Sequence, residues 1–223
     1  MTEKQWLACT RPDWMLEHVR TKMSHRKLRL FAVACCRRTE QLFLDERCDT
    51  AVEVAELFAD GLATQDERKQ AAEGVRACRQ GLSGLDESYR AVRAAHLAAS
   101  FLCAAFPFES AQAALTFCPR AIGFMSEDYL TTQRQEEELH CQLLRDIAGN
   151  PFQKIRLDRT WLTSDTTLLA HAIYQRKRFG DLPILADALE EAGCTHEGLL
   201  AHCRENQTHV RGCWVIDLLL GNS

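Results

Sequence analysis

Apolar residues recur every three or four positions through most of the chain. The clearest case is the segment 24–43, where Leu28, Phe31 and Cys35 fall on one side of a helical wheel and Lys and Arg residues fall on the other. One segment, 152–162, departs from this spacing, and we expect it to be a short irregular or strand-like connector. The helical spacing returns at 49–62, 65–80, 85–106 and 131–149. The pattern predicts an all-α protein, either a multi-helix bundle or an array of helical hairpins.

Prolines interrupt the helical pattern near the middle of the chain. A helix that ends before Pro107 restarts there, and Pro119 marks a second interruption. The stretch 119–127 is therefore the predicted boundary between two parts of the molecule. We expect an N-terminal helical region at 1–120 and a C-terminal helical region at 126–223, which could also form one continuous domain.

The C-terminal tail, from residue 181 to residue 221, is the part of the chain richest in reactive side chains. It contains three of the eleven cysteines and three of the eight histidines. His209 and Cys213 stand four positions apart in a predicted final helix, so both side chains reach one ion. Thiolate and imidazole groups are usual zinc ligands, and His202 is a further donor nearby. No cofactor is needed to explain the chain, but zinc could be held here. The candidate zinc ligands are Cys194, Cys203, His209 and Cys213.

Two other interpretations use the same side chains. His209, Cys213 and Asp217 recur at every fourth position, so Cys213 could act as a nucleophile with His209 as its base. No glycine-rich turn adjoins them to hold an oxyanion, and no tight C-x2-C pair marks a zinc ribbon. Cys213, Trp214 and the leucines that follow also fit a buried closing helix. The spacing favours this packing interpretation.

A second pair of possible metal ligands lies in the predicted helix 131–149. Glu136 and His140 stand one helical turn apart there, a spacing that brings two donors together. A di-metal carboxylate bundle needs a second helix with a Glu-x-x-His pair and further inward-facing glutamates. We find no such partner helix in the sequence, which disfavours a di-metal centre.

A basic run precedes these segments. Between residues 20 and 38 lie seven Lys and Arg residues and no acidic residue. Clustered cations bind polyanions because they release counterions, so this helix is a candidate nucleic-acid site. The alternative is a solvated helix face beside the acidic residues at 45–49. No aromatic side chain is interleaved for base stacking, which favours the solvated face. The candidate nucleic-acid residues are Arg26, Lys27, Arg37 and Arg38.

The composition agrees with a chain that folds around its own core. Of the 223 residues 46% are apolar, and the net charge is −4. Residues 1–125 carry a net charge of +1 and residues 126–223 a net charge of −5, and this mild asymmetry argues against a general nucleic-acid coat protein. No apolar segment approaches the roughly 18 residues of a membrane span, and no signal-peptide core follows Met1. We expect a soluble, cytoplasmic protein in which reduced cysteines fill the interior.

Several segments resemble a family of uncharacterised bacterial proteins that is abundant in planctomycetes. They include SHRKLRLFAVACCRR at 24–38 and LLRDIAGNPF at 143–152, and the resemblance covers nearly the whole chain. LPILADALEEAG is also similar to the YADWLEE-type motif of a short repeat-companion domain in the same bacteria. The resemblance implies no particular activity, cofactor or catalytic residue. Its most distinctive blocks are LPILADALEEAGC at 182–194, LLAHCR at 199–204 and HVRGCWVIDLLLG at 209–221.

The sequence contains no phosphate loop, no paired catalytic carboxylates and no dinucleotide-binding turn. It therefore favours an interaction or scaffolding module whose partner is another protein, and an enzyme is the less favoured class. Zinc binding and nucleic-acid binding are the alternatives. We expect an exposed groove in the tail that receives a partner helix or peptide. The predicted partner-binding residues are Leu182, Leu185, Leu189 and Trp214.

Overall fold

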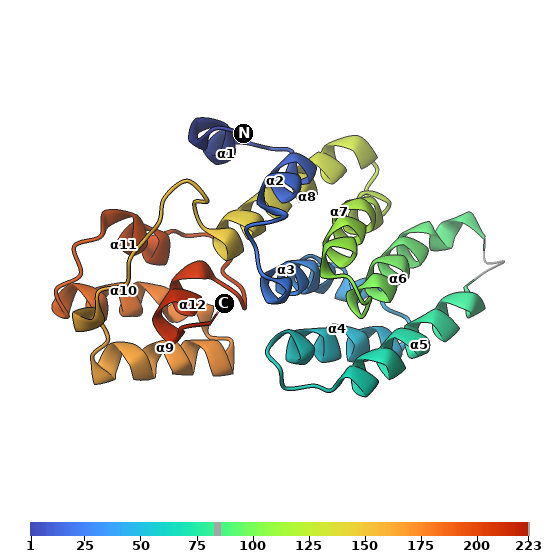
Figure 1. The fold of residues 1–223 in the computed structure, drawn as a ribbon. Coiled ribbons are helices and arrows are strands. Elements are labelled where there is room, and N and C mark those ends of the chain that lie inside the picture. The colour runs from blue at the N-terminus through green and yellow to red at the C-terminus, as the bar shows by residue number, and fades with distance from the viewer. Residues whose placement is uncertain (83–85, 223) are drawn as a thin grey trace.

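The computed structural model describes residues 1–82 and 86–222, and within them it contains helices, turns and loops but no strand (Figure 1). This confirms the all-α prediction. No helix in the described residues is both long and apolar enough to cross a lipid bilayer. The α-helices are α1 (Glu3–Ala8), α2 (Pro12–Val19), α3 (His25–Arg37), α4 (Glu46–Ala59), α5 (Gln65–Gly81), α6 (Arg90–Leu102), α7 (Pro107–Gly123), α8 (Tyr129–Ala148), α9 (Ser164–Arg176), α10 (Leu182–Glu191), α11 (Glu197–Arg204) and α12 (Trp214–Leu220). Short 3-10 helices are η1 (Glu40–Leu42), η2 (Glu87–Tyr89), η3 (Arg159–Trp161) and η4 (Phe179–Asp181).

Local hydrogen bonds explain where several helices begin and end. The Ser24 hydroxyl accepts a hydrogen bond from the backbone at the start of α3, and Thr64 with Glu67 forms a capping box at the start of α5. Pro107 occupies the first turn of α7, as predicted. Helix α8 ends at Gly149, whose φ of 66° favours glycine. Leu85, the predicted start of a helix at 85–106, and Ser223 lie outside the described residues.

The larger buried cluster, the first core, is built around α3, which packs against α4, α6, α7 and α8. Phe31, Cys35 and Leu144 are fully buried in it. Burying one large apolar side chain stabilises a fold by about 1.5–3 kcal/mol, so this cluster supplies much of the driving force. None of the eleven cysteines, all of which lie in the described part, forms a disulfide, and ten of them are buried. The buried cysteines fill the interior, as predicted.

The second core is formed by α9 to α12, drawn in orange and red in Figure 1. Leu182, Leu185 and Leu189 lie on the inner face of α10 and have no exposed surface. This corrects the expectation of an exposed groove at these leucines. The apolar stripe of α10 is covered by the chain's own helices α9 and α11, and Trp214 is partly buried against the same core.

The predicted boundary at 119–127 covers the end of α7 and part of the turn before α8, and both helices pack into the first core. Pro119 does not break its helix, because α7 continues to Gly123. Along the chain, the buried residues of the first core end at Ile147 and those of the second core begin at Trp161. The segment 153–158 has no regular structure, and η3 follows it. The connector at 152–162 was predicted to be irregular or strand-like, and the structure shows the irregular form.

Ion pairs join the basic helix α3 to distant parts of the chain. Arg26 forms a bidentate pair with Asp217 of α12, at 2.8 and 3.1 Å, and also pairs with Asp60 at 2.9 Å. Lys27 donates to the carbonyl oxygen of Ile147 at 2.7 Å and lies 3.5 Å from Asp217. Both side chains are largely buried, so they fasten α3 to the second core.

The other two residues of the predicted nucleic-acid site are paired in the same way. Arg37 lies 2.9 Å from Glu40 and 3.2 Å from Glu56, and Arg38 forms a bidentate pair with Glu136. All four candidate cations thus have carboxylate partners within the chain. This corrects the expectation of a free basic face, and it also shows that these partners are not the acidic residues at 45–49.

Candidate metal centre

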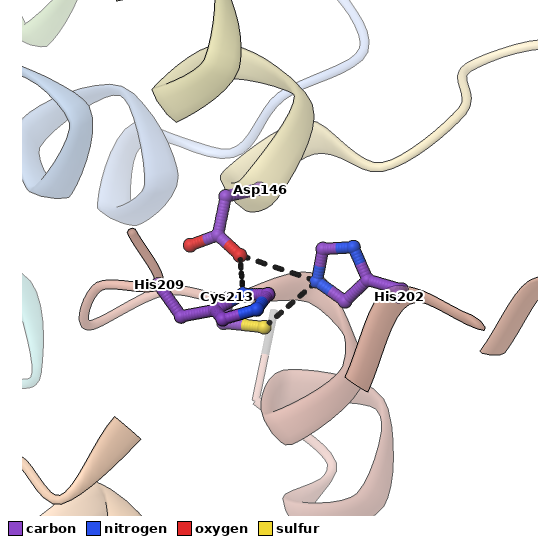
Figure 2. A group of neighbouring side chains, drawn as sticks. All are labelled: Asp146, His202, His209 and Cys213. Carbon is purple, nitrogen blue, oxygen red and sulfur yellow. Dashed lines mark hydrogen bonds and ion pairs between the residues drawn. The ribbon is translucent and has the colours of Figure 1, made fainter. Parts of the chain in front are cut away.

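Asp146, His202, His209 and Cys213 meet at the junction of the two cores (Figure 2). One ligand atom from each residue lies within 4.8 Å of the others. Asp146 comes from the last turn of α8 and His202 from α11, while His209 and Cys213 belong to the loop that leads into α12. Segments 67 residues apart in the chain thus supply one compact group of donor atoms.

Two glycines shape the backbone around this group. Gly212 has a φ of 94°, and a Cβ there would approach a Leu30 methyl carbon to 3.0 Å, so the turn before Cys213 requires glycine. A Cβ at Gly149 would lie 3.1 Å from the Trp214 ring. The close contact of Trp214 with the end of α8 therefore holds the start of α12 beside Asp146.

The Asp146 carboxylate is the hub of the group. Its Oδ1 lies 2.6 Å from His209 Nδ1 and 3.2 Å from His202 Nε2, and its Oδ2 accepts a hydrogen bond from the Val210 backbone at 2.9 Å. The Cys213 sulfur is 3.3 Å from His202 Nε2. Asp146 and Cys213 have essentially no exposed surface. The four side chains consequently interact with one another rather than with solvent.

Burial and charge set the protonation of this group. Burial acts to raise the pKa of Asp146, but the hydrogen bonds from His202 and His209 outweigh it, and its pKa lies below the ordinary value. Burial, together with the nearby Asp146 charge, raises the pKa of Cys213 well above its ordinary value. Asp146 is thus a carboxylate, and Cys213 is a thiol unless a cation is bound beside it.

His202 Nε2 has both Asp146 and Cys213 as neighbours, and without a metal its hydrogen points at the Asp146 carboxylate. A cation between the three groups would accept a lone pair from each of them. His202 Nδ1–H would then need an acceptor, and the Gln207 side-chain amide, 3.5 Å away, can turn its oxygen toward it.

The distances fit a tetrahedral zinc ion in part. Zn–N and Zn–O bonds of about 2.0–2.1 Å and a Zn–S bond of about 2.3 Å place neighbouring ligand atoms roughly 3.3–3.6 Å apart. The two contacts of His202, at 3.2 and 3.3 Å, approach this spacing. The 2.6 Å contact between Asp146 and His209 is a hydrogen-bond distance. An ion would therefore move these two side chains apart by about 0.7 Å.

A second group of donor atoms lies inside the first core. The sulfur atoms of Cys48 and Cys78 are 3.8 Å apart and lie 3.4 and 3.6 Å from His96 Nδ1. The other ring nitrogen, Nε2, accepts a hydrogen bond from the Leu44 backbone at 3.2 Å. Nδ1 of a neutral His96 therefore carries the hydrogen and points it at the sulfurs. This ring is not free to ligate a metal, and His96 is a hydrogen-bonded histidine of the first core.

The Glu136 and His140 pair does not gain further ligands. His140 Nε2 lies 3.3 Å from Glu136, but this carboxylate is already held by Arg38. Burial alone would raise the pKa of Glu136, but His140 and Arg38 outweigh this effect and lower the pKa to about 2. In residues 1–82 and 86–222 no third Cys, His or acidic residue joins this pair.

The structure divides the four predicted zinc ligands. His209 and Cys213 belong to the centre, whereas Cys194 and Cys203 are buried in the second core and contribute no donor to it. Burial raises the pKa of Cys203 to about 12. The prediction of Cys194 and Cys203 as ligands is therefore corrected. Asp146 and His202 complete the group instead.

The predicted stripe of His209, Cys213 and Asp217 does not form. Helix α12 begins at Trp214, so His209 and Cys213 precede it, and Asp217 pairs with Arg26. Asp146 was missed by the sequence analysis. Its signal was a carboxylate on the apolar face of a helix, between Leu143 and Ile147, where an acidic residue needs a buried partner.

No protein-family model matches the chain, and no similar protein was found among the curated sequences or the solved structures.

Proposed function

We propose that the protein binds one zinc ion through Asp146, His202, His209 and Cys213. The observation that carries the proposal is the convergence of four donor atoms from three separate segments within 4.8 Å, at a buried position. Buried polar side chains need interaction partners, and one bound ion would interact with all four side chains at once.

The chemistry of the donors supports zinc rather than a harder cation. Calcium and magnesium take oxygen ligands, whereas this group offers one sulfur, two imidazole nitrogens and one carboxylate oxygen. Four protein ligands fill a tetrahedral shell and leave no position for water or substrate. The proposed site is consequently structural, and it implies no hydrolytic or redox chemistry.

Charge balance favours the same ion. Asp146 carries one negative charge, and Cys213 would lose its proton on binding, so the two ligand charges neutralise Zn²⁺ inside a buried site. The ion would tie the end of α8 to α11 and to the loop before α12. An interaction or scaffolding role for the whole chain, as predicted from the sequence, is compatible with such an ion because a closed site leaves the outer surface unchanged.

The test is the zinc content of protein purified without added metal, measured by elemental analysis. We expect about one equivalent of zinc in the wild type and a loss of most of it in Cys213→Ser, which removes one of four ligands. Cys203→Ser is the matched control, because this thiol is equally buried but lies outside the group. A wild type that holds no zinc, even after incubation with zinc and removal of the excess, would exclude the proposal.

A further inference from the structure

Two buried arginines, one on α3 and one on α5, meet at the C-terminal end of α6. Arg29 and Arg68 are only 3% and 6% exposed, and their guanidinium carbons lie 5.2 and 5.4 Å from the centre of the Phe58 ring. Arg68 donates to the carbonyl oxygen of Cys103, and Arg29 donates to the carbonyl oxygens on either side of it, at 2.5 and 3.1 Å. The fold therefore holds two positive charges close together in its interior.

This pair of charges has no carboxylate partner. In residues 1–82 and 86–222 neither arginine forms an ion pair, and the other hydrogen bond of Arg68 is to the Gln65 side chain. Burial, and after it the charge of Arg68, lowers the pKa of Arg29. The carbonyl groups at the end of a helix supply only about half a negative charge, and buried cations are normally paired. The two arginines consequently favour an anion close by.

A cavity of about 420 Å³ borders Arg68. It lies between α5 and the end of α6, which pack against each other in Figure 1, and residues at the start of α7 complete its wall. Arg68 makes its hydrogen bonds through Nε and Nη1, and Nη2 makes none. In the described part of the chain, the buried side-chain atoms that lack a partner do not include Nη2, so this nitrogen keeps solvent-accessible surface. It is an open donor at the wall of the cavity.

The wall of the cavity is positively charged. Four cationic side chains line it, and Glu73 and Glu109 are its two acids, so its net charge is +2. Neither glutamate forms an ion pair within 1–82 and 86–222, and the exposed side chain of Arg76 has no ion pair or hydrogen bond there. The Arg79 guanidinium lies 3.4 Å from the Ser100 hydroxyl. The acids of the wall thus leave its arginines open to an added anion. The four cations are Arg68, Lys69, Arg76 and Arg79.

The charge and the shape of the cavity define the anion. Guanidinium groups bind phosphate oxygens through parallel N–H groups, and a phosphate monoester carries about 1.5 to 2 negative charges at neutral pH, which balances the wall. The cavity is also large enough for an organic molecule, because small-molecule sites begin at about 300 Å³. Its remaining surface includes apolar side chains, namely Ala72, Phe101, Ala104 and Ala105.

We propose that this cavity binds a small organic phosphate monoester. Arg68 Nη2 and the guanidinium groups of Arg76 and Arg79 bind the phosphate oxygens, and the organic part lies against Phe101. Lys69 lies 3.4 Å from Asp66 and is not required. The cavity shares no residue with the proposed zinc ligands, so this inference goes beyond the zinc site and does not depend on it.

The test is isothermal titration of the purified chain with phenyl phosphate at low ionic strength and about pH 8, where the second proton of a monoester, with a pKa of about 6, is lost. Phenyl sulfate has a similar shape but a single negative charge, and it is the comparison probe. We expect saturable one-to-one binding of phenyl phosphate, at least about tenfold tighter than that of phenyl sulfate. No saturable binding up to about 10 mM would overturn the proposal, and so would equal affinity for the two probes.

Substitutions on the exposed side of the cavity test the assignment without disturbing the core. Arg76→Gln removes one guanidinium group and should weaken phenyl phosphate binding by about fivefold or more. Arg176→Gln is the matched control, because this arginine is also exposed on a helix but lies outside the cavity, and its affinity should match that of the wild type. Glu73→Gln removes a negative charge from the wall and should strengthen binding by about threefold.

The buried anchor needs a variant of its own. Arg68→Gln should abolish binding, but it also alters the core, so its titration is accompanied by a circular dichroism spectrum. The gain expected for Glu73→Gln cannot arise from a loss of folding. Wild-type affinity in Arg68→Gln would contradict the assignment, and so would equal affinity in the wild type, Arg76→Gln and Glu73→Gln.

Discussion

Residues 1–82 and 86–222 contain two buried groups of cysteine and histidine, and the groups differ in the hydrogen-bond partner of the histidine ring's second nitrogen. In the first core, His96 Nε2 accepts from the Leu44 backbone, so Nδ1 keeps its hydrogen and faces two sulfurs as a donor. In the centre between the cores, His202 Nδ1 faces only the adaptable Gln207 amide, and a carboxylate joins the group. Short distances between donor atoms therefore do not define a metal site. The deciding feature is the ring nitrogen that faces away from the group, because its hydrogen-bond partner determines whether the other nitrogen carries a hydrogen or a lone pair.

The carboxylate makes the largest difference between the two groups. Asp146→Asn removes the negative charge that both histidines face, and we expect the free energy of unfolding to fall by about 3 kcal/mol, as for a buried pair that loses one partner. Urea denaturation of the purified proteins measures it. Asp187→Asn provides the control, since Asp187 is an exposed partner of Arg204 and should change stability by less than about 1 kcal/mol. Equal effects of the two substitutions would show that Asp146 is not the hub.

Zinc should stabilise the protein through one group only. At a free zinc concentration about 100 times the dissociation constant, the native state gains about 2.7 kcal/mol, which raises the Tm by about 5–10 °C in a chain of this size. Cys213→Ser should abolish this increase, and Cys78→Ser should preserve it. Differential scanning calorimetry with zinc and with a chelator gives both values. If Cys78→Ser also lost the zinc-dependent increase in Tm, the result would indicate that the metal binds in the first core.

His96→Ala should weaken the fold without affecting zinc. It leaves a cavity and removes the acceptor of the Leu44 N–H, and we expect a loss of about 2 kcal/mol in the free energy of unfolding. Zinc content should stay at the wild-type level. A variant with lower zinc content but unchanged stability would reverse the roles assigned to the two groups.

The affinity for zinc should depend on pH. Burial raises the pKa of Cys213, so its thiol is protonated at neutral pH and must release a proton when zinc binds. For each proton released on binding, the affinity for zinc should fall about tenfold per unit decrease in pH. Titrations with a competing chelator between pH 6 and pH 8 measure this slope. A flat profile would mean that Cys213 is not a ligand.

Stability without metal should change over a different pH range. The folded pKa of Asp146 is lower than the unfolded one, so the contribution of this carboxylate is complete above the unfolded value of about 3.9 and is lost as pH falls through the folded pKa. Acid unfolding of the wild type should accordingly be shifted to lower pH relative to Asp146→Asn. If the normalised acid-unfolding curves of the two proteins coincided, they would contradict the lowering of the Asp146 pKa on folding.

The sequence was sufficient for the fold class, because helical periodicity and capping residues act locally. The residues at Leu28, Phe31 and Cys35 were placed on the buried face, and they are buried. The leucines of α10 show the limit of this reasoning. An apolar stripe must be covered, but periodicity does not reveal whether the chain itself or a partner covers it.

The candidate site was predictable only in part for the same reason. His209 and Cys213 are close in sequence and were named together, whereas Asp146 lies far from them along the chain and reaches them only through tertiary packing. The positive φ of Gly212 also ended the helical spacing on which the Asp217 stripe depended. Cys194 and Cys203 matched the expected ligand type, but their neighbours are apolar side chains.

The most direct measurement is X-ray absorption at the zinc edge of protein loaded with one equivalent of the metal. We expect one sulfur at about 2.3 Å and three nitrogen or oxygen atoms at about 2.0–2.1 Å. Two sulfurs in the shell would place the ion at Cys48 and Cys78, and a shell of six oxygens would place it on the surface. Either result would contradict the assignment of the metal to Asp146, His202, His209 and Cys213.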